Sequence, residues 1–131
     1  MQSRYTALRR SAEQLRRVRL LRAKTPDELR EVLAVVRGRA CDLSSVALDD
    51  QGSKLHIPVQ GDVPRRSGGE LIVRRIVEFS MADSTGIRWF DVDGLTYDPH
   101  TRQLLIQSSS PIRFLLTVEH LDVAVKISEH R

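Results

Sequence analysis

The first part of the chain has apolar residues at the spacing of an α-helix. Intervals of three and four residues separate Tyr5, Leu8, Ala12, Leu15, Val18 and Leu21. Such a pattern predicts a helix over residues 3–23 with one apolar stripe, and arginines fill the rest of its circumference. Neighbouring arginines repel each other, so the stripe needs a surface to cover: the protein's own body, a second copy or another partner. We treat residues 1–24 as a basic amphipathic helix.

A second helix is predicted over residues 26–37. The run Thr25-Pro26-Asp27-Glu28 has the form of a capping box, with proline at the first helical position and acidic residues at the positive end of the helix dipole. Gly38 is a typical C-terminal stop. The predicted buried face consists of Leu29, Val32, Leu33 and Val36.

Beyond residue 40 the apolar period changes from helical to two, which is typical of half-buried strands. The predicted strands lie at 43–48, 54–60, 71–79, 87–92, 95–97, 104–107, 112–118 and 121–127. Turn residues separate them at 49–53, 98–102 and 108–111. No connection is long enough to hold a helix, so residues 40–128 should form an antiparallel region.

These patterns together predict a single α+β domain spanning residues 1–131. Two N-terminal helices should precede an antiparallel sheet of about seven strands, curled into a sandwich or a half-open barrel. The 26–37 helix should pack on one face of that sheet. A chain of 131 residues is long enough to form one hydrophobic core of this kind.

The charge of the protein is unevenly distributed along the chain. Residues 1–24 carry eight basic residues against one acidic residue, a net charge of +7, whereas the rest carries 13 basic and 16 acidic residues, a net charge of −3. The candidate partner-binding residues are therefore the arginines of the first segment: Arg9, Arg10, Arg16, Arg17, Arg19 and Arg22. They favour electrostatic contact with an acidic partner.

We expect a non-catalytic binding or assembly module that self-associates through the first helix or an edge strand, or that binds another protein. The alternative is electrostatic binding of nucleic acid through residues 4–24, whose arginines would neutralise several phosphates. Contact with an anionic membrane surface is a third alternative, although the apolar stripe of the helix is short. No cofactor is expected.

The single cysteine, Cys41, excludes an internal disulfide and is compatible with a reducing compartment. We expect it to be a buried, inert thiol. No apolar run reaches the ~18 residues of a membrane span, and the N-terminal region lacks the pattern of a signal peptide. We therefore expect a cytoplasmic protein without a transmembrane segment.

The run from Phe90 to Asp98 resembles the first motif of the haloacid dehalogenase superfamily of phosphatases. In that family an apolar strand ends in Asp-x-Asp-Gly, followed by Thr-Leu. The resemblance implies that Asp91 is the nucleophile and Asp93 the acid/base, with Mg²⁺ held between them. It covers nine residues, Leu95-Thr96 stand in reverse order, and only 33 residues follow Asp98. This remainder is too short for the parallel sheet of that family.

A structural interpretation of residues 87–98 is therefore preferred. Asp91 and Asp93 share one face of a strand, Gly94 introduces a kink, and Asp98 begins a hairpin turn. Both aspartates are expected to point away from the core and to bind nothing. A metal ion, if the protein bound one, would use Asp91, Asp93 and Asp98, but no metal site is predicted. The four histidines, including His56, show no ligand spacing on one element.

Overall fold

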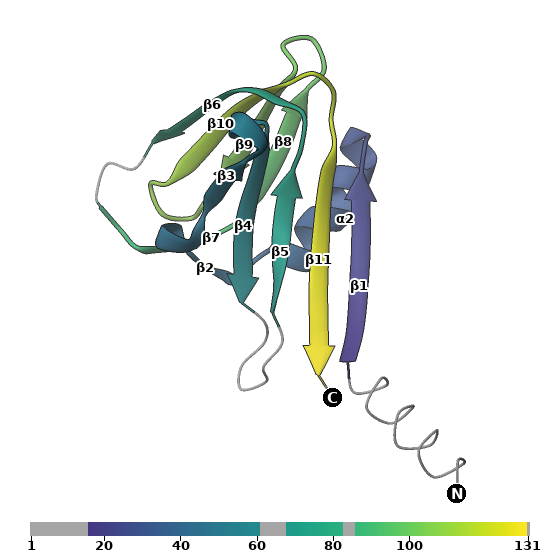
Figure 1. Cartoon of the computed structure of the whole chain (residues 1–131), viewed down its shortest axis with the longest axis vertical. Coiled ribbons are helices and arrows are strands. Elements are labelled where there is room, and N and C mark those ends of the chain that lie inside the picture. The colour runs from purple at the N-terminus through teal and green to yellow at the C-terminus, as the bar shows by residue number, and fades with distance from the viewer. Residues whose placement is uncertain (1–15, 61–67, 83–85, 131) are drawn as a thin grey trace, which may run out of the picture.

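A computed structural model describes residues 16–60, 68–82 and 86–130 of the chain (Figure 1). These residues form eleven strands in three antiparallel sheets and one α-helix. In chain order the elements are β1 (Arg16–Ala23), α2 (Pro26–Val36), β2 (Ala40–Asp42), β3 (Ala47–Asp49), β4 (Lys54–Gln60), β5 (Gly68–Val73), β6 (Ile76–Ala82), β7 (Trp89–Asp91), β8 (Gly94–Asp98), β9 (Gln103–Gln107), β10 (Arg113–Val118) and β11 (Val123–His130). Two 3₁₀ turns, η1 (Leu43–Ser45) and η2 (Asp50–Gly52), precede β3 and β4.

The prediction of two N-terminal helices was wrong. Arg16–Ala23 is not the end of a helix but the edge strand β1, which pairs with β11 along its whole length, from Arg16 opposite His130 to Ala23 opposite Val123. Pairing with β11 satisfies the backbone hydrogen bonds of this segment. A helix would satisfy them too, but it would bring the four arginines close together on successive turns, where their like charges repel. Residues 1–15, the other part of the predicted 1–24 helix, lie outside the described residues.

Helix α2 begins where local signals place it. The side chain of Thr25 accepts a hydrogen bond from the backbone N–H of Glu28 at 3.2 Å, and Glu28 in turn accepts one from the backbone N–H of Lys24 at 3.1 Å. Leu29, Val32 and Val36 are buried. The helix contacts β1, β11 and β8, so it packs against the edge strands of two different sheets and covers the opening between them.

Two sheets and α2 enclose the hydrophobic core. The five-stranded sheet has the order β1-β11-β5-β4-β3, the four-stranded sheet has the order β6-β10-β9-β8, and β2 pairs with β7. Alternate residues of each strand face inward, as in β4, where Leu55, Ile57 and Val59 are buried while the residues between them are half-buried. Phe114 of β10 lies near the centre of the core, within ring contact of Phe79 and Phe90.

The expectation of one sheet of about seven strands was also wrong. The predicted strand 71–79 is two strands, β5 and β6, which belong to different sheets and are separated by Arg74 and Arg75. Arg75 adopts a left-handed conformation with φ of 62°, and this residue changes the direction of the chain. Three further short strands add to the count: β3 pairs with the start of β4, and β2 and β7 pair with each other in a separate two-stranded sheet.

Candidate functional site

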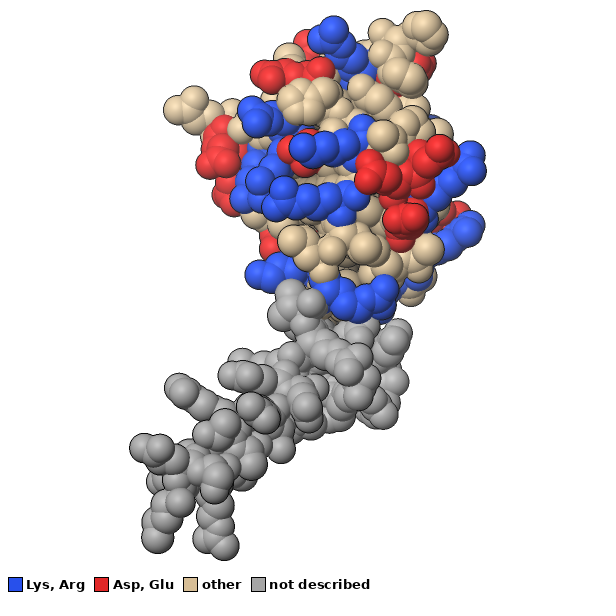
Figure 2. Space-filling view, turned by 90° about the vertical axis from the view of Figure 1, so that its right-hand side faces the viewer, with Lys and Arg blue, Asp and Glu red and all other residues tan. Residues whose placement is uncertain are grey.

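Among the arginines singled out in the sequence, the side chains of Arg19 and Arg22 are described, and these two do not share a face. Arg9 and Arg10 lie outside the described residues, as do the side chains of Arg16 and Arg17. Arg19 and Arg22 are exposed on β1, but an odd number of positions separates them, so they project from opposite faces of the strand. Figure 2 looks onto the side of the molecule that carries β1 and α2, where basic side chains lie beside a group of acidic ones.

The three aspartates considered for a metal ion are separated into three local contacts. Asp91 accepts hydrogen bonds from the side chains and backbone of the 108–110 turn. Asp93 lies 3.4 Å from Nε of Arg37, and Asp98 accepts from the backbone N–H of His100 at 2.9 Å. No cluster of three metal-ligating side chains occurs within residues 16–60, 68–82 and 86–130.

The hydrogen bonds of the Asp91 side chain show its structural role. Its Oδ1 accepts from the Oγ atoms of Ser108 and Ser109 at 3.0 and 2.6 Å, and from the backbone N–H of Ser109 at 3.1 Å. These bonds, led by the one from the Ser109 side chain, hold the pKa of the Asp91 carboxyl below its usual range. Asp91 therefore fixes the turn between β9 and β10.

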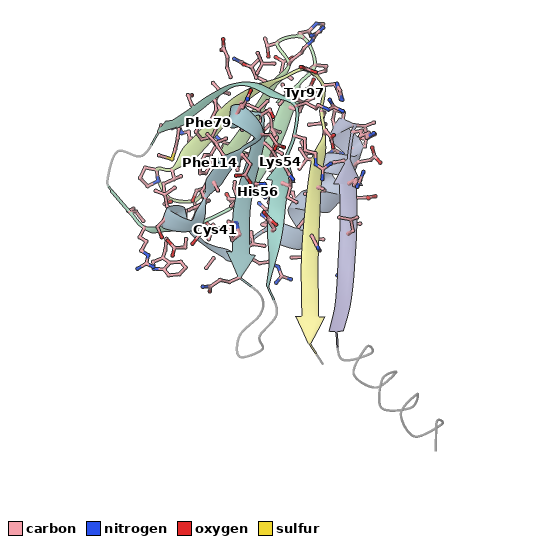
Figure 3. The ribbon with its side chains drawn as sticks, in the orientation of Figure 1. Cys41, Lys54, His56, Phe79, Tyr97 and Phe114 are labelled. Carbon is pink, nitrogen blue, oxygen red and sulfur yellow. The ribbon has the colours of Figure 1, made fainter. Side chains whose placement is uncertain are left out.

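His56 is enclosed by two carboxylates. It lies on β4, its Nδ1 hydrogen-bonds Glu70 of β5, and its Nε2 lies 2.9 Å from Oδ2 of Asp49 on β3. Figure 3 shows His56 and Lys54 on the same strand, two positions apart, where both occupy the outer sheet face. A carboxylate thus lies near each ring nitrogen, but among the described residues only Nδ1 makes a hydrogen bond, because the approach of Nε2 to Asp49 lacks hydrogen-bond geometry. The cluster ties three strands together.

A second charged group organises the surface near β7. Arg88 donates to both carboxylate oxygens of Asp42, at 3.1 and 2.9 Å, and its guanidinium lies 5.3 Å from the centroid of the Trp89 ring. The bond from Arg88 is the main reason that the pKa of Asp42 lies far below its usual range, followed by the bond from Ser44. Trp89 is half-exposed, and the cation–π contact with Arg88 stabilises its ring in this position on the surface.

The most distinctive surface is the edge strand β6 of the four-stranded sheet. In the described part of the chain six large apolar side chains are exposed, and three of them lie on β6 or on its neighbour β10: Val77, Met81 and Leu115. Val77 is 60% exposed and Met81 is 46% exposed. We call β6 with these three residues the β6 edge.

The β6 edge is open along its outer side. β6 ends the strand order β6-β10-β9-β8, and among the described residues no strand pairs with its other side (Figure 1). The opposite end of this sheet, β8, is contacted by α2. The strand itself is held firmly, because its Phe79 ring lies 6.0 Å from that of Phe114 (Figure 3). A strand with exposed apolar residues and no neighbouring strand on one side is suited to pair with another strand.

The sequence of β6 does not by itself mark this strand as an edge. The segment 76–82, Ile-Val-Glu-Phe-Ser-Met-Ala, has one charge and apolar residues on both strand faces. A central strand buried on both sides has the same pattern. Only the tertiary structure shows that one side of this strand has no neighbour.

Comparisons with protein-family models, with curated proteins and with solved structures found no match. Within the described residues, no helix has the length and apolar character needed to cross a membrane.

Proposed function

We propose that the protein is a non-catalytic assembly module that self-associates through the β6 edge. The observation that carries this proposal is the exposure of Val77 and Met81 on a strand that has no neighbouring strand on its outer side among the described residues. Of its backbone groups, the N–H of Ile76 at the start of the strand bonds outside the sheet, to the carbonyl of Ser53. Exposed apolar edge strands are uncommon in monomeric proteins because they pair with other chains.

The β6 edge is compatible with a second copy of itself. In a two-fold antiparallel pairing centred on Phe79, Val77 would lie opposite the partner's Met81, and Glu78 opposite the partner's Ser80. Such a pairing brings apolar residues together and places no like charges directly opposite each other. By contrast, β1 carries four arginines in eight residues, so pairing of two copies through β1 would concentrate positive charge.

Three further observations favour a role without catalysis. Each ring nitrogen of His56 lies against a carboxylate, the aspartates of the 87–98 segment are separated, and burial raises the pKa of the Cys41 thiol to about 12. A buried free cysteine and the membrane-span result agree with a cytoplasmic location, which remains part of the proposal.

The expected dimer is weak. One strand pairing with a few apolar contacts buries less surface than the ~1,600 Å² of a standard stable interface, so we expect a dissociation constant in the micromolar range. Sedimentation velocity over a wide range of protein concentrations should therefore show a monomer converting to a dimer.

Substitutions on two different edges identify the interface. The double variant Val77→Lys, Met81→Lys should remain monomeric, because it adds four charges to a two-fold interface. The matched control is Leu20→Lys on β1, where a leucine is 54% exposed on the edge of the other sheet. It should dimerise like the wild type. A wild type that stays monomeric at every concentration contradicts the proposal, and loss of dimer only in Leu20→Lys would assign assembly to β1 instead.

Nucleic-acid binding through the first segment is the second candidate function. The observation that favours it is the exposure of Arg19 and Arg22 on an edge strand within a segment of net charge +7. Fluorescence anisotropy with a labelled 20-nucleotide DNA single strand should then show affinity that falls steeply with salt. Arg22→Glu should weaken binding more than Arg113→Glu, which changes the same charge on β10. Equal effects would mean nonspecific attraction.

A further inference from the structure

A polar pocket lies at the end of the five-stranded sheet where β4 begins, β5 ends and β11 begins. Its volume is about 250 Å³ and it is lined by Asp50, Ser53, Lys54, Arg74, Arg75 and Asp122. It is distinct from the β6 edge, since none of its lining residues belongs to the exposed apolar group. The volume accommodates several water-sized groups, and so a small organic molecule.

The pocket walls are fixed by backbone hydrogen bonds between separate turns. The backbone N–H of Arg74 donates to the carbonyl of Asp122 at 3.0 Å, and that of Ile76 donates to the carbonyl of Ser53 at 3.0 Å. Asp50 and Arg75 both have left-handed backbones, with φ of 53° and 62°. Left-handed residues other than glycine persist where the surrounding structure holds them, and they concentrate at ligand sites. The walls are thus preformed.

The charges that line the pocket are not neutralised by each other. In the described part of the chain the side chains of Lys54, Arg74, Arg75, Asp50 and Asp122 make no ion pair or hydrogen bond with another side chain. Three cations and two carboxylates therefore line a single concave site. Elsewhere in the molecule Arg88 and Asp42 form an ion pair, whereas the charged residues of the pocket form none with each other.

Arg74 also lines the pocket, and its side chain has no hydrogen-bond partner among the described residues. Its Nε is buried. A guanidinium stays charged at all physiological pH values, so a buried N–H without an acceptor is unfavourable. Buried polar atoms without partners are rare in folded proteins, and a bound ion or water accounts for many of them. A planar guanidinium donates best to the oxygens of a phosphate or a carboxylate.

We propose that this pocket binds a small organic oxyanion, with Arg74 as its main contact and Lys54 and Arg75 beside it. The net charge of the lining is +1, which favours an anion. Asp50 and Asp122 disfavour a bare, multiply charged ion and accept hydrogen bonds from hydroxyl or ammonium groups. The ligand class is therefore a small molecule that carries both a phosphate or carboxylate and hydrogen-bond donors.

Isothermal titration calorimetry at constant ionic strength tests this proposal with three probes: inorganic phosphate, glycerol 3-phosphate and alanine. Glycerol 3-phosphate represents a phosphate with hydroxyl groups, and alanine represents a carboxylate with an ammonium group. At least one of these two should bind more tightly than inorganic phosphate. The better probe identifies whether the oxyanion is a phosphate or a carboxylate.

Variants assign the binding to the pocket. Arg74→Gln should weaken binding of the better probe by about tenfold or more, because it removes a charge-assisted hydrogen bond. Lys54→Gln provides a second variant if Arg74→Gln folds poorly, and circular dichroism checks the fold of each. Arg113→Gln, which removes a charge on β10, should bind like the wild type. The proposal is overturned if none of the probes binds, or if Arg74→Gln and Lys54→Gln both bind as the wild type does.

Discussion

Replacing Asp91 by asparagine should destabilise the protein at neutral pH, and the size of the effect can be worked out from the structure. Three hydrogen bonds from Ser108 and Ser109 converge on Oδ1 of Asp91. Hydrogen bonds to a charged acceptor contribute about 1.5–3 kcal/mol each when buried. Asp91 is only half-buried and the three bonds share one oxygen, so we expect a total loss of about 1–2 kcal/mol in the free energy of unfolding.

Acid should remove this difference between the wild type and Asp91→Asn. The folded-state pKa of Asp91 is lowered, chiefly by its hydrogen bond from Ser109. The ionised carboxylate thus stabilises the folded state above the unfolded pKa of about 3.9, and this stabilisation is lost as the pH falls through the folded pKa. Asparagine does not ionise, so the variant lacks this dependence. The stability gap should be constant above about pH 5 and should shrink below pH 4.

Urea unfolding followed by far-ultraviolet circular dichroism measures both parts of this expectation. Asp93→Asn is the matched control, because it removes the same charge two residues away, where the side chain makes one contact with a described charged group, a 3.4 Å approach to Arg37. We expect the control to change the stability by less than about 0.5 kcal/mol, as for most exposed ion pairs. If Asp91→Asn and Asp93→Asn have equal effects, or if the gap for Asp91→Asn persists in acid, the hydrogen bonds do not fix the turn as argued.

Three further expectations test the core, one close approach and the helix cap. Burial raises the pKa of the Cys41 thiol to about 12, so this thiol should react with a disulfide reagent at pH 8 only after the protein is unfolded in urea. Rapid reaction in the native state would contradict its burial. Gly69→Ala should lower the free energy of unfolding by about 3 kcal/mol, because the added Cβ would meet the carbonyl oxygen of Lys126. Gly94→Ala should be tolerated. Equal urea midpoints for these two variants would refute the close approach at Gly69. Thr25→Ala should lower the stability by about 1 kcal/mol in the same measurement, since it removes the N-cap, and an unchanged midpoint would show that the cap is not used.

The parts of the fold that the sequence indicates are those whose signals are local. Helix α2 has its cap, its first turn and its buried stripe within twelve residues, from Thr25 to Val36. The alternation in β10 and β11 and the turn at Asp98 are equally local, and the antiparallel pairing follows from the short connections. For these elements the residues that decide the structure are neighbours in the chain.

The N-terminal segment was misread because its decisive partner is distant in the sequence. The run Arg-Arg-Val-Arg-Leu-Leu-Arg-Ala fits a helical stripe about as well as a strand. β1 pairs with β11, which lies 100 to 114 positions further along the chain, and the backbone pairing outweighs local preference. The Arg74-Arg75 break was missed for a related reason, because the left-handed Arg75 has neither the glycine nor the asparagine that normally marks such a turn.

The candidate sites were missed because they are products of topology. The polar pocket gathers residues from η2, β4, the β5–β6 turn and the β10–β11 turn, which no spacing in the sequence brings together. His56 likewise finds Glu70 on the next strand across a seven-residue segment. Charged residues scattered along a chain give no indication of which of them will converge.

The placement of α2 also determines which edge of the molecule is available for assembly. The two large sheets have four edge strands, namely β1 and β3 in one and β6 and β8 in the other. Helix α2 contacts β1 and β8, and β3 has only three residues, too few to template a stable pairing. β6 is seven residues long and carries only one charge, and outside its own sheet it contacts the short turn η2 rather than the helix. The open apolar edge is thus a consequence of packing the single described helix on the opposite side of the core, which is why the proposal of self-association stands on β6 rather than on the arginines of the first segment.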